Sequence, residues 1–430
     1  MTQYKFNPLE HSKENHSHKV KGTLFLYIAC VYIIFNIGRM QELFPFLSNF
    51  YLMKILGGLS VVGLLMNLHQ MKESMRAPQF KAILGITFIG IFTIPFSVWP
   101  GYSFNFLVDY YWKTLLVFLL IISMTTSLKD MNKVIWPLLI AVGFLSALSV
   151  KSDIQGLTFA DDRVFVSSTY DSNDLALVMI VALPFAIFGY LSQKGLIKMI
   201  LGGLTALIVM TIILTASRGG FLGFLGVSLF IFIGVRKYFK KAIIPLIVVI
   251  ALGGGIFIFY AKATSFWERM STIMTYEQDY NVTSYGGRIE VWKRGLKMII
   301  KNPLLGVGIN GFVTAEGLSH NDIGGKWSTA HNSFIQIGAE LGIIGLFLFC
   351  YVIWSSLRGV NRIIKDISQK DEDKQSLFTL IALRCSWIGY IIGGFFLSAA
   401  YSPIFYFLAG VSTFISILNN KIMSEGIKTT

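Results

Sequence analysis

The sequence predicts an all-α polytopic membrane protein with about twelve transmembrane helices and one large loop outside the membrane. The chain has 430 residues, of which 54% are hydrophobic and only 14% are charged, whereas a soluble domain carries about a quarter charged residues. The apolar residues occur in repeated uncharged runs of about 18 residues or more, enough to cross the hydrocarbon core as a helix. Because backbone amides inside lipid must pair within the segment, these runs are expected to be helices.

The apolar runs divide the chain into regular membrane crossings. The first run follows about twenty polar residues and has no small-residue cleavage site, so we expect it to remain as the first span. The predicted spans are 22–38, 50–68, 82–98, 105–125, 134–150, 173–191, 199–216, 220–235, 242–261, 333–355, 378–398 and 401–418.

Basic residues between the runs predict the orientation. If the amino terminus is inside, the short outer loops hold only Arg39, Lys151, Arg163 and Arg218, and the inner segments hold many more basic residues. This distribution accounts for the net charge of +14 without nucleic-acid binding. Both termini are therefore predicted to be cytoplasmic. The predicted organisation is an inner tail (1–21), spans one to nine (22–261), an outer loop (262–331), spans ten to twelve (332–418) and a second inner tail (419–430).

The outer loop contains a predicted amphipathic helix. Apolar residues recur in it at three- and four-residue steps and charged residues fill the other face, which is typical of a helix lying in the membrane interface. A helix packed on the spans beneath it is the alternative, and the two are compatible. The apolar face is Ile289, Trp292, Leu296, Ile299 and Pro303, and the charged face is Glu290, Lys293, Arg294, Lys297 and Lys301.

The stretch from Gly306 to Gly311 matches the glycine pattern of dinucleotide-binding loops. Such a loop requires a preceding strand and a βαβ unit, whereas this stretch follows a predicted helix and Pro303. We therefore predict a tight turn, in which glycine tolerates positive φ.

His331 stands directly before the tenth predicted span. Asn332 or Ser333 is expected to cap that helix and so to place His331 at the membrane boundary. An imidazole there can take a proton from a hydroxyl group. A purely structural hydrogen bond of the histidine is the alternative.

Three outer arginines are candidates for binding an anion. Arg218 lies in the short turn between the seventh and eighth spans, and Arg288 precedes the amphipathic helix, whose amino terminus adds positive potential. Arg163 lies in the loop before the sixth span. A guanidinium group grips phosphate oxygens in a bidentate manner, although snorkelling to lipid headgroups is the alternative for Arg218. Arginines and one histidine on one face predict a site for a pyrophosphate-bearing lipid and a hydroxyl acceptor.

The order of these motifs resembles that of the O-antigen ligase/polymerase family of bacterial envelope glycan transferases. The resemblance covers residues 160–350 through its motifs and the whole chain through its layout. The matching stretches are Ser217-Arg218-Gly219-Gly220, Gly287-Arg288 with Trp292, Lys301-Asn-Pro303 with Gly306-x-Gly308, His331-Asn332, Glu340-x-Gly342-Ile-Ile-Gly345, and Arg163 followed by Asn173 and Ala176.

The resemblance implies a fold related to the multi-span glycosyltransferases, in the bacterial inner membrane with a periplasmic site. It implies inverting transfer of a glycan from undecaprenyl pyrophosphate, without metal or other cofactor. Arg218 and Arg288 would then grip the pyrophosphate, and His331 would be the base or positioner for the attacking hydroxyl. Arg163, Asn332 and Trp292 are the further substrate-binding candidates.

Three functions remain open from the sequence. A ligase would transfer the glycan to an acceptor glycolipid such as lipid A–core, and a polymerase would transfer it to a second lipid-linked repeat unit. A secondary transporter is the rival from another class, because functional charges near mid-membrane are typical of transporters. Asp109 and Lys113 are spaced to pair, which leaves Glu340 as the main candidate for such a charge.

Overall fold

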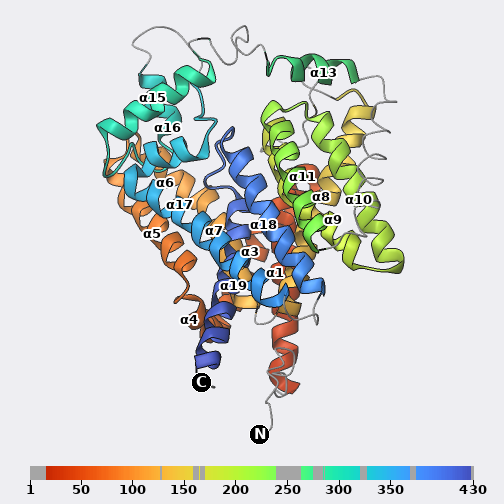
Figure 1. The fold of residues 1–430 in the computed structure, drawn as a ribbon. Coiled ribbons are helices and arrows are strands. Elements are labelled where there is room, and N and C mark those ends of the chain that lie inside the picture. The colour runs from red at the N-terminus through yellow and green to blue at the C-terminus, as the bar shows by residue number, and fades with distance from the viewer. Residues whose placement is uncertain are drawn as a thin grey trace.

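The computed structural model describes residues 16–125, 128–157, 164, 170–238, 263–274, 284, 286–319, 327–368 and 374–427, and every regular element in these ranges is helical (Figure 1). The first half contains α1 (His16–Gly38), α2 (Met40–Leu43), η1 (Pro45–Phe50), α3 (Leu52–Met66), α4 (Leu68–Ser74), α5 (Pro78–Phe92), η2 (Ile94–Phe96), α6 (Pro100–Phe106), η3 (Leu107–Tyr111), α7 (Trp112–Met124), α8 (Leu128–Ile154) and α9 (Ser172–Ser192). The second half contains α10 (Gly195–Leu214), α11 (Arg218–Tyr238), α13 (Ala263–Ser271), α15 (Arg288–Lys301), α16 (Phe312–Leu318), α17 (Ser333–Ser368), α18 (Lys374–Gly394) and α19 (Pro403–Ile427).

The helices confirm the predicted class of polytopic membrane protein. Within the described part of the chain, 7 segments are long and apolar enough to cross a membrane, and four shorter apolar helices accompany them. Each predicted span among the described residues overlaps one of these helices. The ninth predicted span, 242–261, lies outside the described residues.

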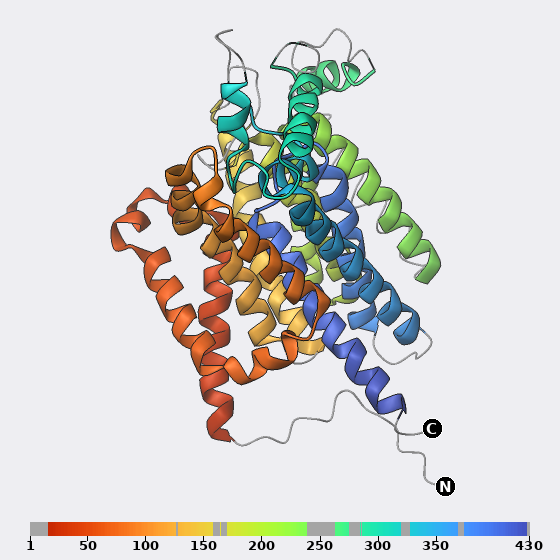
Figure 2. The ribbon, with the colours of Figure 1, turned by 90° about the vertical axis from the view of Figure 1, so that its left-hand side faces the viewer.

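The two ends of the helical bundle differ. Helix α1 begins and α19 ends at one end of the molecule, and α13, α15 and α16 lie at the opposite end (Figures 1 and 2). The predicted large loop thus contributes short helices to one end only.

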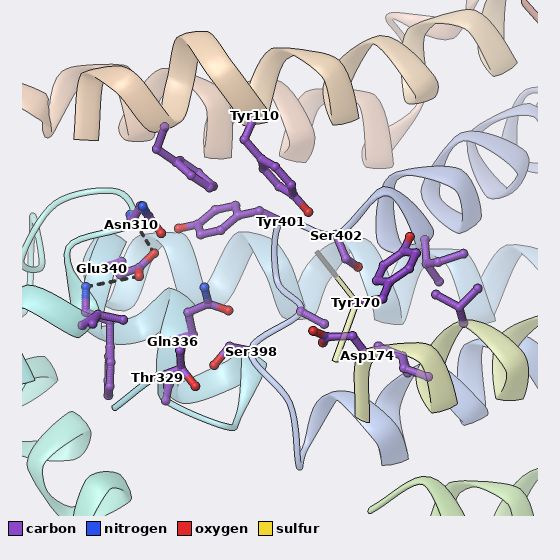
Figure 3. A pocket seen from close by; sticks show the side chains of 18 residues that line it. Tyr110, Tyr170, Asp174, Asn310, Thr329, Gln336, Glu340, Ser398, Tyr401 and Ser402 are labelled. Atoms are coloured by element: carbon purple, nitrogen blue, oxygen red, sulfur yellow. Dashed lines mark hydrogen bonds between the residues drawn. The ribbon is translucent and has the colours of Figure 1, made fainter. Parts of the chain in front are cut away.

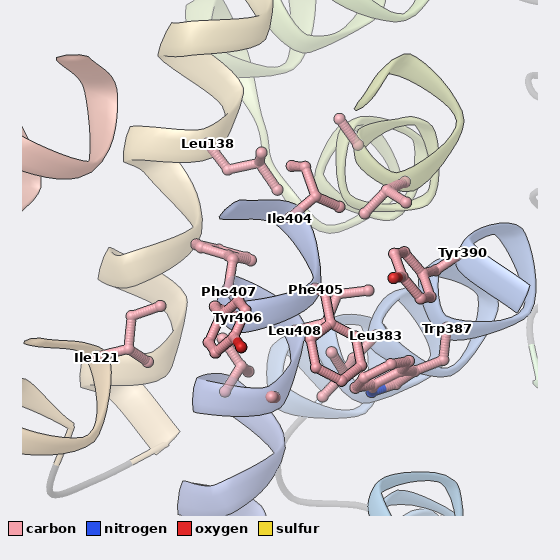
Figure 4. Packing of buried hydrophobic residues seen from close by; sticks show 14 of the residues in the cluster. Ile121, Leu138, Leu383, Trp387, Tyr390, Ile404, Phe405, Tyr406, Phe407 and Leu408 are labelled. Carbon is pink, nitrogen blue, oxygen red and sulfur yellow. The ribbon is translucent and has the colours of Figure 1, made fainter. Parts of the chain in front are cut away.

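The core is formed by apolar and aromatic side chains from the last two helices and their neighbours (Figure 4). Trp387 and Tyr390 of α18 pack against Phe405 of α19, with ring centroids 5.9 and 5.4 Å from that of Phe405. Their polar atoms are satisfied, because Trp387 donates to Ser412 Oγ (2.8 Å) and Tyr390 to the carbonyl of Ala399 (2.8 Å). This packing fixes the segment between α18 and α19.

Helix α17 is broken within the membrane-spanning region. Gly342 has φ 69° and ψ −171°, which interrupts the helix. Backbone groups freed by such a break inside a membrane have to be satisfied by protein, and the segment 303–308 provides the partners. The bonds, donor first, are Val307 to Ala339 (2.8 Å), Gly308 to Glu340 (3.0 Å) and Ile343 to Pro303 (2.8 Å).

The glycine-rich stretch is the predicted tight turn. Gly306 has φ 64° and Gly308 has φ 93°. A Cβ at Gly306 would lie 2.4 Å from the carbonyl carbon of Glu340, so only glycine allows this close approach. The turn therefore packs into the break of α17, and the structure gives it no strand of a dinucleotide-binding unit among the described residues.

Helix α15 is amphipathic, but its buried face differs from the predicted one. The buried residues are Val291, Gly295 and Met298, whereas Leu296 is 50% exposed. A Cβ at Gly295 would lie 2.4 Å from the Ile335 side chain of α17. The predicted face lies one residue further along the helix than the buried one. Gly295 permits the close packing on α17, but it has no apolar side chain, so the apolar pattern of the sequence does not mark it as buried.

Arg294 also departs from the predicted charged face. Its guanidinium forms an ion pair with Glu316 of α16 (Nη2 to Oε1, 2.6 Å), and the Glu316 side chain is fully buried. Glu316 Oε2 accepts a hydrogen bond from the Ser328 amide (2.8 Å). This buried pair connects α15 and α16 to the chain that leads to His331.

Candidate functional site

The segment that joins α18 to α19, residues 395–402 (the 395–402 turn), is a common contact of three predicted motifs. It lies between the amino-terminal ends of α11 and α17 and the start of α15. The contacts are Phe395 with Trp292, Phe396 with Gly219 and Ser398 with His331.

His331 lies at the amino-terminal end of α17, as predicted. Its φ of 46° places the backbone in the left-handed region, which histidine enters more readily than most residues. The His331 amide donates to Ser398 Oγ (2.9 Å), and ring atom Nε2 lies 3.3 Å from Thr329 Oγ1. The bend at His331 turns the chain into the helix and holds the half-buried ring at its mouth.

Asn332 is the cap of α17. Its Oδ1 accepts hydrogen bonds from the amides of Phe334 (2.9 Å) and Ile335 (3.0 Å), which is the geometry of an N-cap. The sequence expectation of a cap at Asn332 or Ser333 is confirmed at Asn332. Ser333 instead donates to the Leu397 carbonyl (2.7 Å) and thereby secures the 395–402 turn.

Arg218 opens α11 next to two closely packed glycines. Its Nη1 donates to Thr272 Oγ1, just after α13 (3.0 Å). A Cβ at Gly219 would lie 2.8 Å from Phe396 Cβ, and one at Gly220 would lie 2.6 Å from Ala176 Cβ. The two glycines therefore let the end of α11 approach both α9 and the 395–402 turn.

The amino-terminal end of α9 links the two arginine segments. Ser217, which precedes Arg218, donates from Oγ to Asn173 Oδ1 (2.8 Å). Burial lowers the pKa of Arg288, and the nearby carboxylate of Asp171 opposes this effect. Arg218 and Arg288 thus approach the same end of α9 from the sequence-distant helices α11 and α15.

Trp292 lies one helical turn after Arg288 and connects α15 to the histidine segment. Its Nε1 donates to the Ala330 carbonyl (3.0 Å), and its ring meets that of Phe395 edge to face, with centroids 5.4 Å apart. Trp292 therefore contacts other parts of the protein and orients the segment before His331. Arg163, the remaining candidate, lies outside the described residues.

A cavity of about 210 Å³ lies beside these residues (Figure 3). Thr329, Ala330 and Ser398 contribute to its wall, so the cavity directly adjoins the His331 segment. Aromatic and polar side chains from five elements line the rest. They include Tyr110, Tyr170, Asp174, Gln336, Glu340 and Tyr401.

Glu340 has a structural role at one end of the cavity. Its carboxyl group accepts hydrogen bonds from the amides of Asn310 (3.0 Å), in the turn before α16, and Phe312 (3.3 Å), the first residue of α16 (Figure 3). Glu340 therefore holds the glycine-rich turn against the broken helix. This contact explains a buried acidic residue that the sequence left open as a transporter feature.

The sequence did not indicate several parts of this site. The 395–402 turn has no motif, and its role depends on backbone contacts with distant helices. Tyr110 lies on a π-helical segment, η3, a feature often found at functional sites, and Asp174 lies in the first turn of α9. Among the described residues, no three His, Cys, Asp or Glu side chains form a group that could hold a metal ion.

Comparison with known proteins supports a class for the central part of the chain. Residues 203–350 match the family model described as O-antigen ligase. This range contains Arg218, Arg288, the glycine-rich turn and His331. The match and the relatives below support assignment of the chain to the O-antigen ligase family, in agreement with the resemblance of its motifs.

Three relatives match parts of the chain, and two of them have names that describe a function. A protein of Rickettsia conorii named "Putative polysaccharide ligase" is 30% identical over 196 residues, 44% of this chain and 43% of that protein. One of Rickettsia felis with the same name is 31% identical over 116 residues, 25% of each chain. An uncharacterized protein of Haemophilus influenzae is 27% identical over 231 residues, 49% of this chain and 56% of that protein. The chain thus spans about half or less of the length of these relatives.

Proposed function

We propose that this protein transfers a glycan from undecaprenyl pyrophosphate to an acceptor hydroxyl on the periplasmic face of the bacterial inner membrane. The observation that carries the proposal is the 395–402 turn, which contacts His331 and the neighbours of Arg218 and Arg288 at once. The assignment to the O-antigen ligase family supports the same reaction class.

The proposed step is an inverting displacement. The acceptor oxygen attacks the anomeric carbon of the donor and forms the new glycosidic bond. The bond between that carbon and the pyrophosphate oxygen breaks, and the electron pair leaves with undecaprenyl pyrophosphate. The acceptor proton passes to the His331 imidazole, which thus acts as the base.

The arginines would stabilise the leaving group. Negative charge develops on the departing pyrophosphate, and preorganised cations in a partly dehydrated site stabilise such charge strongly. Arg288 is largely removed from water, and this burial lowers its pKa. The guanidinium group nevertheless stays protonated and positively charged at neutral pH. This chemistry requires no metal or other cofactor.

Substitution of the three side chains tests the proposal. Arg218→Ala, Arg288→Ala and His331→Ala should each reduce glycan transfer by about 10²–10³, because each removes a group that stabilises the transition state. Glycolipids from a deletion strain complemented with each variant provide the readout, and immunoblots of membranes confirm insertion. Lys293→Ala, on the exposed side of α15, is the matched control and should transfer normally. Wild-type product from all three site variants would refute the proposal.

The same strain distinguishes ligase from polymerase. Loss of a ligase leaves long glycan on the lipid carrier, whereas loss of a polymerase leaves single repeat units. We propose the ligase on the basis of the names of the two Rickettsia relatives, with lipid A–core, the acceptor that the resemblance of the motifs suggests. Accumulation of single repeats would instead assign the polymerase reaction.

A further inference from the structure

We propose that the cavity beside His331 binds an uncharged sugar ring of the glycan substrate, separately from the arginines that would take the pyrophosphate. This inference rests on the proposed function and names the part of the substrate that each region receives.

The charge of the cavity argues against a phosphate ligand. Asp174 and Glu340 carry carboxyl groups in its wall, and none of the described residues that line it is arginine, lysine or histidine. A pyrophosphate there would be desolvated next to acidic groups with no cationic side chain in the described part of the cavity wall to contact it, which is unfavourable. The cavity is thus suited to a neutral ligand that donates hydrogen bonds.

The lining suits a sugar in particular. A sugar ring has apolar C–H faces and hydroxyl edges, and the cavity combines tyrosine rings with acid and amide side chains (Figure 3). Glu340 and Gln336 already accept backbone hydrogen bonds, from Asn310 and Ala400 respectively. Asp174, toward the other end of the cavity in Figure 3, also accepts a backbone hydrogen bond, from Asp171, but its side chain is only half-buried, whereas those of Glu340 and Gln336 are buried. Asp174 is therefore the acceptor that we assign to a sugar hydroxyl.

A buried arginine keeps the aromatic wall in place. Arg39, only 8% exposed, lies over the rings of Tyr110 and Tyr170, at 5.5 Å from each centroid. The Tyr170 hydroxyl also donates to the Ile37 carbonyl (3.0 Å). Contacts with the end of α1 and with Arg39, which follows it, thus hold both rings in place, and a preorganised wall lowers the entropic cost of binding.

The position of the cavity places the sugar next to the reacting groups. Thr329 and Ala330 belong to its wall and immediately precede His331, and Ser398 joins the wall to the His331 amide. The bound ring is either the first sugar of the donor, whose anomeric carbon reacts, or the acceptor sugar, whose hydroxyl attacks. Both have the same recognition chemistry.

Binding of two lipids distinguishes this site from the pyrophosphate site. Purified full-length protein in lipid nanodiscs would be titrated with undecaprenyl pyrophosphate and with the same lipid carrying its repeat unit. Asp174→Asn should weaken binding of the glycan-bearing lipid by about three- to tenfold, as expected when one hydrogen bond is lost or weakened, and leave the affinity for the bare lipid unchanged. Tyr110→Phe is the second variant, and Asp109→Asn and Tyr102→Phe, at exposed positions, are the matched controls.

The outcomes separate the two possible sources of the sugar. Loss of affinity for the glycan-bearing lipid alone assigns the cavity to the donor sugar. Unchanged affinity for both lipids, with a raised KM for lipid A–core in a transfer assay, assigns it to the acceptor sugar. Two results would overturn the inference. One is that Asp174→Asn and Tyr110→Phe lower the affinity for both lipids equally, and the other is that neither variant changes the affinity for either lipid or the KM for lipid A–core.

The proposed function has its own readout in the same titration. Arg218→Ala should lower the affinity for both lipids, because both carry the pyrophosphate. If Arg218→Ala binds the bare lipid as the wild type does, the pyrophosphate assignment fails, whatever the cavity variants show.

Discussion

At the residue scale, Asn332, which the sequence predicts to bind substrate, has a structural role. Its side chain caps α17 through two backbone amides. Asn332→Ala should therefore lower the free energy of unfolding by about 1 kcal/mol, seen as a lower melting temperature of the purified protein in detergent. Asn332→Asp and Asn332→Ser preserve the cap and should retain both stability and transfer. A stable but inactive Asn332→Ser variant would instead support a direct role in substrate binding.

The ion pair of Arg294 and Glu316 makes a second prediction at this scale. Glu316 is fully buried and also accepts the Ser328 amide. Glu316→Ala removes the buried carboxylate that pairs with the Arg294 guanidinium and accepts the Ser328 amide, and should lower the free energy of unfolding by about 3–5 kcal/mol. Thermal unfolding measures this loss. Glu290→Ala, which removes an exposed ion pair with Lys293, is the control and should change stability by less than about 1 kcal/mol. Equal effects of the two substitutions would contradict the account.

At the element scale, the break in α17 depends on glycine. Gly342 has positive φ, and a Cβ there would lie 2.5 Å from the carbonyl oxygens of Pro303 and Leu304. Gly342→Ala should reduce accumulation of the protein in membranes and shift its melting temperature downward, as fluorescence-detected size-exclusion chromatography would show. Gly203→Ala in α10, where a Cβ meets no atom within 4 Å, should be neutral or stabilising, because alanine favours helix over glycine. Normal accumulation of Gly342→Ala would show that the break tolerates a side chain.

The elements also show what the sequence can and cannot predict. Long apolar runs reveal spans such as α9 and α18, because burial in lipid imposes composition directly. The break at Gly342 and the buried face of α15 were not predicted, since both depend on glycines that permit close approach to another segment. Among the site residues, Arg218, Arg288 and His331 were identifiable from residue type and order. Asp174 and Tyr110 were not, because nothing local distinguishes them from other polar residues near helix ends.

At the scale of the whole molecule, sidedness is the expectation on which the site depends. We expect Lys297 in α15 to lie outside and Lys365 in α17 to lie inside. With Cys30, Cys350 and Cys385 replaced, Lys297→Cys should react with an impermeant maleimide in cells whose outer membrane alone is permeabilised. Lys365→Cys should react only after the inner membrane is opened. Labelling of Lys365→Cys but not of Lys297→Cys under the first condition would exclude a periplasmic site.

The proposed site requires guanidinium groups from α11 and α15 to meet one diphosphate beside His331. A cryo-EM map of the full-length protein in nanodiscs with undecaprenyl pyrophosphate tests this requirement most directly. We predict density for the diphosphate in contact with both Arg218 and Arg288, at the amino-terminal end of α9 and next to the His331 ring. Diphosphate density that contacts neither arginine, or that lies at the end of the molecule where α1 begins, would contradict the account.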